Sequence, residues 1–252
     1  AYFDLEQFSQ SRILDFGCGC GASTMWLARQ FPQSEIVGVE LKDDFLAIAK
    51  ARSEHYGHTN VSFFQSPGGS ELPIEMGQFD IVIMSAVYEH LLPTERKVIL
   101  RKLSSCVRGG GFLFLNQTPN SLFPIELHTT MLPLINYIPD SLAFAAAKRF
   151  SKRVEPEDSW DELLRKGIRG ATVCEITGNL GKNGSAFTML EPTRHGFTDR
   201  VDLWFSTTNP SNLYSVKKLA RVTLKALYKL TGLAMIPDLA LAFQKEITPP
   251  IK

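Results

Sequence analysis

The sequence lacks the features that define several broad protein classes. It has only four cysteines among 252 residues, and their spacing fits no zinc site, so neither a disulfide scaffold nor a structural zinc domain is expected. Its apolar stretches are short or interrupted by proline and aspartate, so no membrane-spanning helix is predicted. The cysteine usage favours a reducing, cytoplasmic setting.

Neither sign of charge is in excess. Lys and Arg total 27 and Asp and Glu total 26, which gives a formal net charge of +1. This balance predicts no polyanionic partner, so nucleic acid is not expected. The hydrophobic fraction of 44% is ordinary for a globular protein, and the length suits one large α/β domain or one domain with an insertion.

The most informative stretch is ILDFGCGCGAST, from Ile13 to Thr24. It predicts a buried strand, then a turn with three glycines, then a helix that begins near Ala22. Glycine lets the backbone turn tightly and approach a ligand because no Cβ is in the way, and the helix N-terminus offers free N–H groups. This pattern indicates a loop that binds a nucleotide-containing cofactor.

Asp15 bears on which cofactor that is. It stands two residues before the first glycine, so we expect its carboxylate near the strand end, at the cofactor. A dinucleotide would place its pyrophosphate there, and the two negative charges would repel. S-adenosylmethionine instead carries an ammonium and a sulfonium at that end, which a carboxylate would attract.

With this acid and its spacing, LDFGCGCG resembles the first motif of class I S-adenosylmethionine-dependent methyltransferases, an apolar run followed by an acid and GxGxG. The resemblance implies S-adenosyl-L-methionine as the cofactor, bound by Asp15, Gly17, Cys18, Gly19 and Gly21. Gly17-x-Gly19-x-x-Ala22 also satisfies the looser dinucleotide fingerprint, so an NAD(P)-dependent oxidoreductase remains an alternative. A non-catalytic S-adenosylmethionine-binding protein is a second alternative.

The next two predicted strands supply further cofactor contacts. Glu40 ends the second strand about 20 residues beyond the glycine loop, where a carboxylate can accept from both ribose hydroxyls. Leu41 is a candidate to pack on the adenine. After the third strand the resembled family commonly has an Asp for the adenine amino group, but this chain has Ser66, Pro67 and Gly68 in that region. We therefore expect backbone groups, Ser66 or Gln65 to hold the adenine.

The stretch FDIVIM, Phe79 to Met84, predicts a fourth strand, with Ser85 and Ala86 at its end as cofactor contacts. The segment through Glu89-His90-Leu91 resembles small-molecule methyltransferases of the ubiquinone and menaquinone type. Some of those bind a divalent metal through Glu-x-x-Glu-His, but Ala86 replaces the first Glu here, so no metal is predicted. The (D/N)PP(Y/F) motif of nucleic-acid amino-methyltransferases is absent, which again predicts no nucleic acid substrate.

Strand signals alternate with helix signals through Asn116, which predicts a parallel sheet with right-handed crossovers. The expected fold is α/β, a Rossmann-like, doubly wound, mostly parallel seven-stranded sheet with an antiparallel closing strand at Leu239 to Phe243 and a helical cap insertion. The predicted domains are a cofactor-binding core over 1–118, a cap over 119–210 that contacts the acceptor, and a C-terminal part over 211–252. Thr172 to Ile176 is a candidate sixth strand.

Catalytic candidates follow from the expected cap. His128 is the candidate general base that removes a proton from the acceptor, with Tyr88 and His90 as the next candidates; a purely structural role for His128 is weighed equally. The apolar segment from Met131 to Ala147 favours a small, partly hydrophobic or lipid-linked acceptor. The sequence thus predicts methyl transfer to such an acceptor.

Residues 215–230 predict a basic amphipathic helix, because lysine and arginine alternate there with leucine and valine. We expect it to cover the sheet with its basic edge in solvent. The alternative is peripheral membrane contact through 215–230, which would suit a lipid-linked acceptor.

Overall fold

Buried strands alternate with helices along the first half of the chain in a computed structural model that describes residues 1–73, 76–181, 187–207 and 214–247. Strands β1, β2 and β4 are short and mostly buried, as the apolar runs predicted, whereas β3 at the edge of the sheet is half-buried to exposed. The elements are β1 (Arg12–Phe16), α1 (Ala22–Gln30), β2 (Glu35–Glu40), α2 (Asp43–His55), β3 (Val61–Gln65), β4 (Phe79–Ser85), α3 (Pro93–Cys106) and β5 (Val107–Pro119).

The strands form one seven-stranded sheet in the order β3-β2-β1-β4-β5-β7-β6. Strands β1 to β5 are parallel, and β7 (Asp238–Lys245) runs antiparallel between β5 and β6 (Phe187–Met189). The predicted closing strand and its position beside the fifth strand are therefore confirmed. From β1 the chain first adds β2 and β3 on one side of the sheet and then β4 and β5 on the other, so the direction of strand addition reverses between β1 and β4. Ligands of open α/β sheets bind at such a point, beyond the carboxyl ends of the strands.

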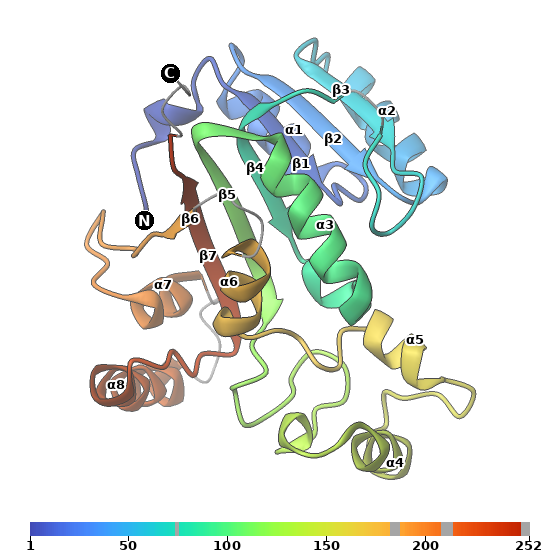
Figure 1. The fold of residues 1–252 in the computed structure, drawn as a ribbon, viewed down its shortest axis with the longest axis vertical. Helices are drawn as coiled ribbons and strands as arrows, with labels where there is room; N and C mark the ends of the chain where they lie inside the picture. The colour runs from blue at the N-terminus through green and yellow to red at the C-terminus, as the bar shows by residue number, and fades with distance from the viewer. Residues whose placement is uncertain (74–75, 182–186, 208–213, 248–252) are drawn as a thin grey trace.

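Helices cover both faces of this sheet (Figure 1). Adjacent strand residues point to opposite faces, so Ile13 and Ile81 pack against Leu27 of α1, whereas Leu14 and Val82 pack on the other side. That second face is covered by α3 and by α6 (Val173–Gly181). The two apolar clusters hold the sheet between helices and fix the positions of the strand ends.

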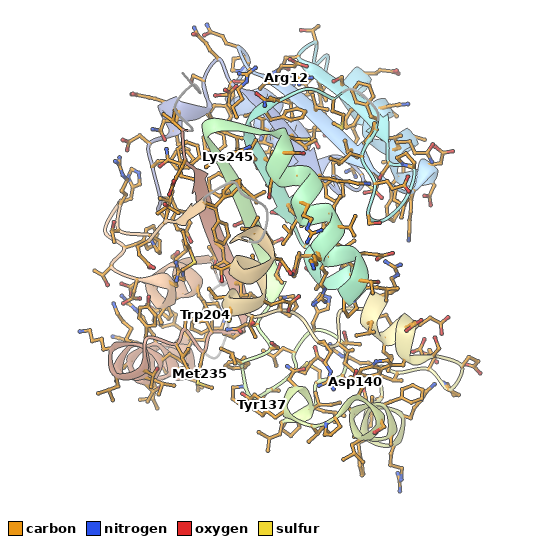
Figure 2. All side chains as sticks on the ribbon, in the orientation of Figure 1. Arg12, Tyr137, Asp140, Trp204, Met235 and Lys245 are labelled. Atoms are coloured by element: carbon orange, nitrogen blue, oxygen red, sulfur yellow. The ribbon has the colours of Figure 1, made fainter. Side chains whose placement is uncertain are left out.

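A cap follows β5 and lies beyond the carboxyl ends of the parallel strands (Figure 1). It contains the 3-10 turn η3 (Ile135–Tyr137), α4 (Asp140–Phe150) and α5 (Trp160–Arg165), and it has its own small apolar cluster. Figure 2 shows Tyr137 and Asp140 on the cap, at the opposite end of the molecule from Arg12 and Lys245. The expected cap is present, with its helices separated by long irregular segments.

Two expectations for the second half of the chain are wrong. Thr172 to Ile176 is not a strand, because α6 begins at Val173 and buries Ile176 and Leu180 against the sheet; the sixth strand is β6. Nor does the basic helix α8 (Tyr214–Thr231) cover the sheet: no residue of α8 is buried, and it packs against α7 (Arg200–Thr207). Apolar runs of this length fit a helix and a strand equally well, and packing decides between them.

No helix in the described part of the chain is long and apolar enough to cross a bilayer. The predicted division into 1–118, 119–210 and 211–252 stays a prediction, and its second boundary lies outside the described residues.

Candidate functional site

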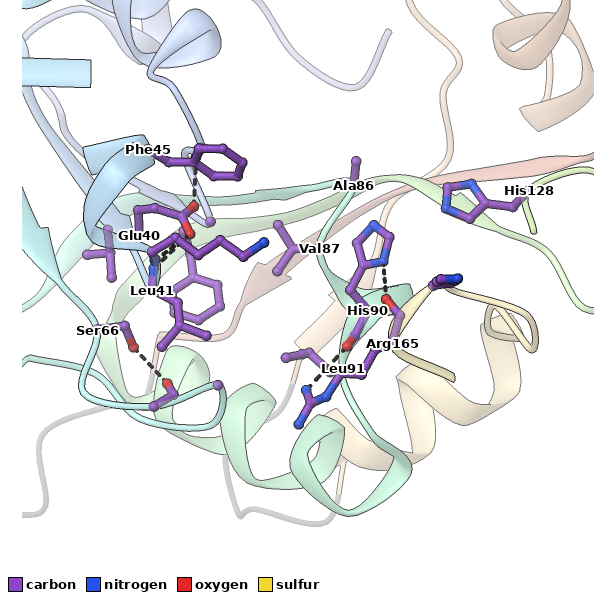
Figure 3. A pocket seen from close by; sticks show the side chains of 18 of the residues that line it. Glu40, Leu41, Phe45, Ser66, Ala86, Val87, His90, Leu91, His128 and Arg165 are labelled. Atoms are coloured by element: carbon purple, nitrogen blue, oxygen red, sulfur yellow. Dashed lines mark hydrogen bonds between the residues drawn. The ribbon is translucent and has the colours of Figure 1, made fainter. Parts of the chain in front are cut away.

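A cavity of about 1020 Å³ opens at the carboxyl ends of β1, β2 and β4, where the sequence placed the site. In Figure 3, Glu40 and Leu41 lie at one end and His128 at the other, with Val87 and His90 between them. We call the glycine loop with the ends of β2 and β3 the cofactor wall. The cap wall consists of His128, Thr129, Arg153, Arg165 and Lys166.

The glycine loop belongs to the cofactor wall. Gly17 and Gly19 line the cavity, and both have positive φ. A Cβ on Gly17 would lie 2.3 Å from Val87, so a larger residue would displace the β4 loop. Gly21, also at positive φ, stands just before α1, where a Cβ would lie 2.9 Å from Ala49. Cys18 is buried behind the loop, and burial raises the pKa of its thiol to about 12.

Asp15 is placed differently from the expectation. It is almost fully buried and does not line the cavity; one carboxylate oxygen accepts hydrogen bonds from Ser23 and Thr24, each at 2.7 Å. Burial raises the pKa of this carboxyl group above its ordinary value. These two hydrogen bonds join the end of β1 to the start of α1. Asp15 therefore stabilises the conformation of the glycine loop without facing the cavity.

Glu40 faces the cavity and joins two loops through backbone hydrogen bonds. One carboxylate oxygen accepts from the Gly19 N–H at 2.8 Å, and the other accepts from Leu41 and Lys42 at 2.8 and 3.0 Å. Leu41 lines the same wall and is half exposed. A carboxylate held so firmly at the cavity edge can accept from paired hydroxyls, as the spacing from the glycine loop predicted.

The turn after β3 closes the cofactor wall. Ser66 and Gly68 line it, whereas Pro67 points away and is exposed. The Ser66 hydroxyl lies 2.8 Å from the Gly68 carbonyl and 2.7 Å from the Glu71 carbonyl. It therefore donates its hydrogen bond within the turn and not to a ligand. Ser66 therefore shapes the turn, and backbone groups remain to hold a base.

Ser85 and Ala86, at the end of β4, line different cavities. Ala86 has a φ of 53° and lines the main cavity, and its N–H donates to the Asn116 carbonyl. Ser85 instead lines a second cavity of about 460 Å³ on the side of Asn116. Tyr88, a candidate catalytic residue, does not reach the main cavity: it is fully buried and donates to Glu175 at 3.0 Å. Burial raises its pKa further, so we discard a catalytic role.

His90 and Glu89 form a polar pair at the floor of the cavity. The His90 Nδ1 lies 2.7 Å from the Arg165 carbonyl, which can only accept, so Nδ1 carries the proton and Nε2 is left as the basic nitrogen. Glu89 is fully buried, and neither carboxylate oxygen has a hydrogen-bond partner among the described residues. Burial raises the pKa of Glu89 to about 7 and lowers that of His90.

His128 approaches this pair from the cap. Its ring centroid lies 5.5 Å from that of His90. Glu126 positions it: this buried carboxylate accepts from the N–H groups of His128, Thr129 and Thr130 at 2.7, 2.8 and 2.5 Å, and also from the Thr130 hydroxyl. A single side chain thus fixes the turn that presents His128 to the cavity.

One group of donor atoms could hold a metal. Among the described residues, one ligand atom each from Glu89, His90 and His128 lies within 4.8 Å of the others. Glu and two His are acceptable ligands for a divalent cation. The sequence-based expectation of no metal stays a prediction.

Sequence reasoning missed most of the cap wall. Arg153, Arg165 and Lys166 contact the cavity, although the sequence predicts only a charged, exposed segment over 152–158 and a short helix over 160–166. Arg165 pairs with Glu95 at 2.5 Å, and Lys166 pairs with Asp158 at 2.6 Å. Charged residues of a cap have no fixed sequence spacing from the strand ends, so no local pattern in the sequence could have placed these residues at the cavity. The sequence shows Glu89 next to His90, but it does not show that Glu89 is completely buried.

Comparison with known proteins supports a methyltransferase domain. A family model described as a methyltransferase domain matches residues 13–111. The chain is 24% identical over 200 residues to a trans-aconitate 2-methyltransferase of Rhodopseudomonas palustris, covering 79% of this chain and 61% of that one. It is 27% identical over 186 residues to a demethylmenaquinone methyltransferase of Lactococcus lactis, covering 73% and 68%.

A solved structure shares the fold. PKMT2 from Rickettsia typhi, in complex with AdoHcy, superposes with a TM-score of 0.57 at 14% identity, over 96% of this chain and 50% of that one. Three of the curated relatives are longer than the match, and the chain spans 26%, 61% and 20% of their length. The resemblance to class I methyltransferases is confirmed for the fold and for residues 13–111, and S-adenosylmethionine is the cofactor of that class. The nicotinamide alternative finds no support here.

Proposed function

We propose that this chain, which carries a class I S-adenosylmethionine-dependent methyltransferase domain, transfers a methyl group to a small acceptor held between the floor of the cavity and the cap wall. The observation that carries the proposal is the single cavity that runs from Gly17 and Glu40 to His90 and His128. Its volume of about 1020 Å³ is at the upper end of the usual range for a small-molecule site, which suits a cofactor and an acceptor side by side.

The residues of the cofactor wall fit S-adenosylmethionine. A nucleoside can approach the backbone at Gly17 and Gly19, where no Cβ intervenes, and Glu40 offers a fixed carboxylate to its ribose. The bound cofactor supplies an electrophilic methyl group on a sulfonium. What the protein supplies is position, because a transfer in line with the departing sulfur requires the acceptor to be held close and correctly oriented.

We assign the proton-accepting role to the histidines at the cap. The neutral Nε2 of His90 can take a proton from an acceptor hydroxyl, and Glu89 Oε1 lies 3.7 Å from it. His128 faces the same space and is the second group within reach. An acceptor that reacts through a carboxylate or a carbon nucleophile would depend less on this pair.

The nature of the acceptor is the finer part of the proposal. Apolar lining lies on the cofactor wall, at Phe16 and Val39, and at Leu91 beside the floor, whereas the cap wall is mostly basic. A small acceptor with an oxygen-bearing polar end fits that division. The apolar lining at Phe16, Val39 and Leu91 favours an acceptor that is partly hydrophobic or lipid-linked.

The test begins with calorimetric titration of S-adenosylmethionine, S-adenosylhomocysteine and NADH. We expect the two sulfur compounds to bind and NADH not to bind. S-adenosylhomocysteine release is then followed with a panel that includes trans-aconitate, a demethylmenaquinone analogue and simple phenols. Tight cofactor binding without turnover of any acceptor would favour the non-catalytic alternative, and binding of NADH alone would refute the proposal.

Two variants then test the histidines. His128→Ala and His90→Ala should each lower turnover of a hydroxyl acceptor by about 10²–10⁴-fold and leave the affinity for S-adenosylmethionine unchanged. His55→Ala is the matched control, because His55 is exposed in the last turn of α2 and does not line the cavity. Full activity in both site variants would remove the base assignment while leaving the methyltransferase proposal intact.

A further inference from the structure

Helix α8 presents an apolar face to solvent. It spans 18 residues, none of them buried, and Val216, Leu219, Val222 and Leu230 are between 61% and 85% exposed. These residues recur at spacings of three, three and eight, which places them on one side of a helix. A contiguous apolar stripe of this kind is unusual on the surface of a soluble domain and indicates an interaction.

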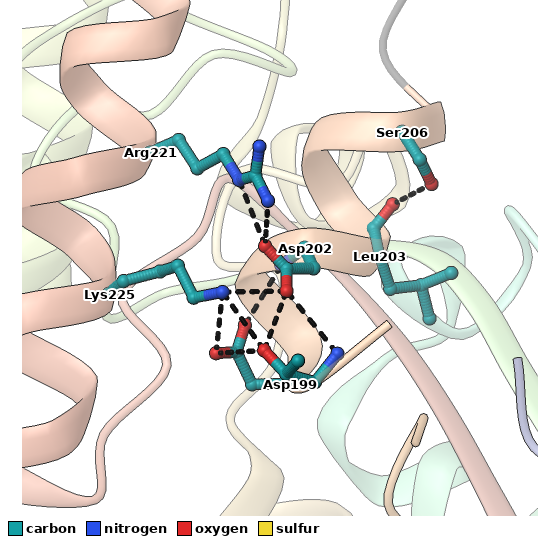
Figure 4. Close-up of polar contacts among 7 residues, drawn as sticks. Asp199, Asp202, Leu203, Ser206, Arg221 and Lys225 are labelled. Atoms are coloured by element: carbon teal, nitrogen blue, oxygen red, sulfur yellow. Dashed lines mark hydrogen bonds and ion pairs between the residues drawn. The ribbon is translucent and has the colours of Figure 1, made fainter. Parts of the chain in front are cut away.

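The rotation of α8 is fixed by ion pairs on its opposite side. Arg221 donates to Asp202 at 2.9 and 2.6 Å, and Lys225 contacts Asp202 at 2.6 Å and Asp199 at 3.3 Å (Figure 4). Tyr228 and Leu224 add apolar contacts with α7 on that side. Because these contacts hold the inner edge against α7, the apolar stripe must point outward.

The cap carries a similar surface at the same end of the molecule. Figure 1 shows α4 and α8 both beyond the carboxyl ends of the parallel strands. On α4, Leu142 and Phe150 are 57% and 67% exposed, and Lys148 and Arg149 stand in its last turn. The two helices thus give this end of the molecule exposed apolar and basic side chains together.

Charge decides which occupant fits. Residues 214–231 contain five basic residues and no acidic residue, and Lys218 and Lys229 remain exposed beside the apolar stripe. A second copy of α8 laid on the first would bring like charges together. An anionic lipid surface instead accepts the apolar stripe and attracts the lysines.

We propose that α8, with the exposed end of the cap, binds the surface of an anionic membrane. The helix lies in the interface with Leu219, Val222 and Leu230 inserted at the headgroup boundary, and it does not cross the bilayer. This position would place the cap, which forms one wall of the main cavity, at the lipid surface. The inference does not depend on methyl transfer, because it concerns binding alone.

Vesicle sedimentation of the full chain tests it. We expect binding to vesicles of phosphatidylcholine with phosphatidylglycerol, little binding to phosphatidylcholine alone, and weaker binding at high salt. Leu219→Glu combined with Leu230→Glu should lower the partition coefficient about tenfold or more, because each change puts a carboxylate on the inserted stripe. Val98→Glu is the control, since Val98 is an apolar residue on α3 that is 40% exposed.

Two outcomes would overturn the proposal, and one control accompanies them. Equal vesicle binding by the double variant and the control would overturn it. A dimer seen by light scattering that the double variant abolishes, without vesicle binding by the parent chain, would assign the stripe to a second copy and would overturn it too. S-adenosylhomocysteine affinity, measured on each variant, shows that the domain is folded and keeps a failure of membrane binding separate from a failure of the methyltransferase proposal.

Discussion

The two walls of the main cavity are built by different means. The cofactor wall consists of strand ends and turns that are fixed by the sheet and by backbone N–H groups, as when Glu40 accepts from three of them. The cap wall is held by side chains: Glu126 within the turn, Arg165 on Glu95, and Arg169 on Asp140. The first wall shares the stability of the core, whereas single substitutions can disturb the second.

Under the proposed function, this difference gives the two walls separate roles. The rigid frame would bind the cofactor. The loops of the cap would bind the acceptor, because loops carry variable function on a rigid scaffold. We therefore expect substitutions in the cap to separate turnover from cofactor affinity, and the following changes test that separation.

Glu126→Ala should have the largest effect. It leaves three N–H groups and the Thr130 hydroxyl without their buried acceptor, which we expect to lower the free energy of unfolding by about 4 kcal/mol. Denaturant titration measures the loss, and turnover should fall because His128 is no longer held. Glu157→Ala, an exposed cap glutamate, is the control. If Glu126→Ala kept full turnover at a temperature where it is folded, the position of His128 would not matter for catalysis.

Glu89 should make stability depend on pH. Its folded pKa is raised from 4.5 to about 7, so the neutral acid is favoured in the folded chain. The stabilising contribution is complete below pH 4.5 and is lost as the pH rises through 7, a change of about 3 kcal/mol. Comparison of the free energy of unfolding at acid and alkaline pH should show this slope in the parent chain and not in Glu89→Gln. Identical slopes would mean that Glu89 is ionised in the folded state.

Glu40→Ala tests the cofactor wall. We expect the affinity for S-adenosylmethionine to fall by about 1–3 kcal/mol, since hydrogen bonds to a charged group are lost. Titration calorimetry measures it, with Glu54→Ala on the exposed side of α2 as control. An unchanged affinity would show that the ribose is bound elsewhere.

Asp202→Asn should have the smallest effect and should act on α8 alone. Burial acts to raise the pKa of Asp202, but hydrogen bonds from Lys225, Thr198 and Arg221 outweigh it and hold the pKa below its ordinary value. The pairs therefore stabilise α8 above the unfolded pKa of 3.8, and the contribution is lost as the pH falls through the folded value. Asp202→Asn should lower the free energy of unfolding by about 1–2 kcal/mol and increase hydrogen exchange in α7 and α8. Increased exchange in β1 or β4 would contradict this local picture.

The sheet was predictable from the sequence because its signals are local. Ile13 to Thr24 shows a strand, a glycine turn and a helix within twelve residues, and the offset to Glu40 follows from one βαβ unit. The site was predictable wherever it lies at a strand end, as for Gly17, Glu40 and Ala86. Asp15 and Ser85 also lie at strand ends, but the direction of their side chains, which a one-letter pattern does not show, takes them out of the main cavity.

The second half was less predictable because its structure depends on distant contacts. The stretch Thr172 to Ile176 has the composition of a strand, yet it becomes a helix where it meets α3. The amphipathic pattern of 215–230 correctly predicts a helix but does not show which face meets the protein, and Asp199 and Asp202 decide that. Arg153 and Lys166 reach the cavity only because the cap folds back over it.

The position of β7 has a consequence for synthesis on the ribosome. Strands β1 to β5 can pair as soon as residue 119 has emerged, so the frame of the cofactor wall can assemble early. Strand β6, by contrast, pairs with β7, which is made more than forty residues later. The nascent chain therefore passes through a stage in which β5 has an open edge. We expect that stage to be the one at which a chaperone is needed, since an unpaired edge invites aggregation.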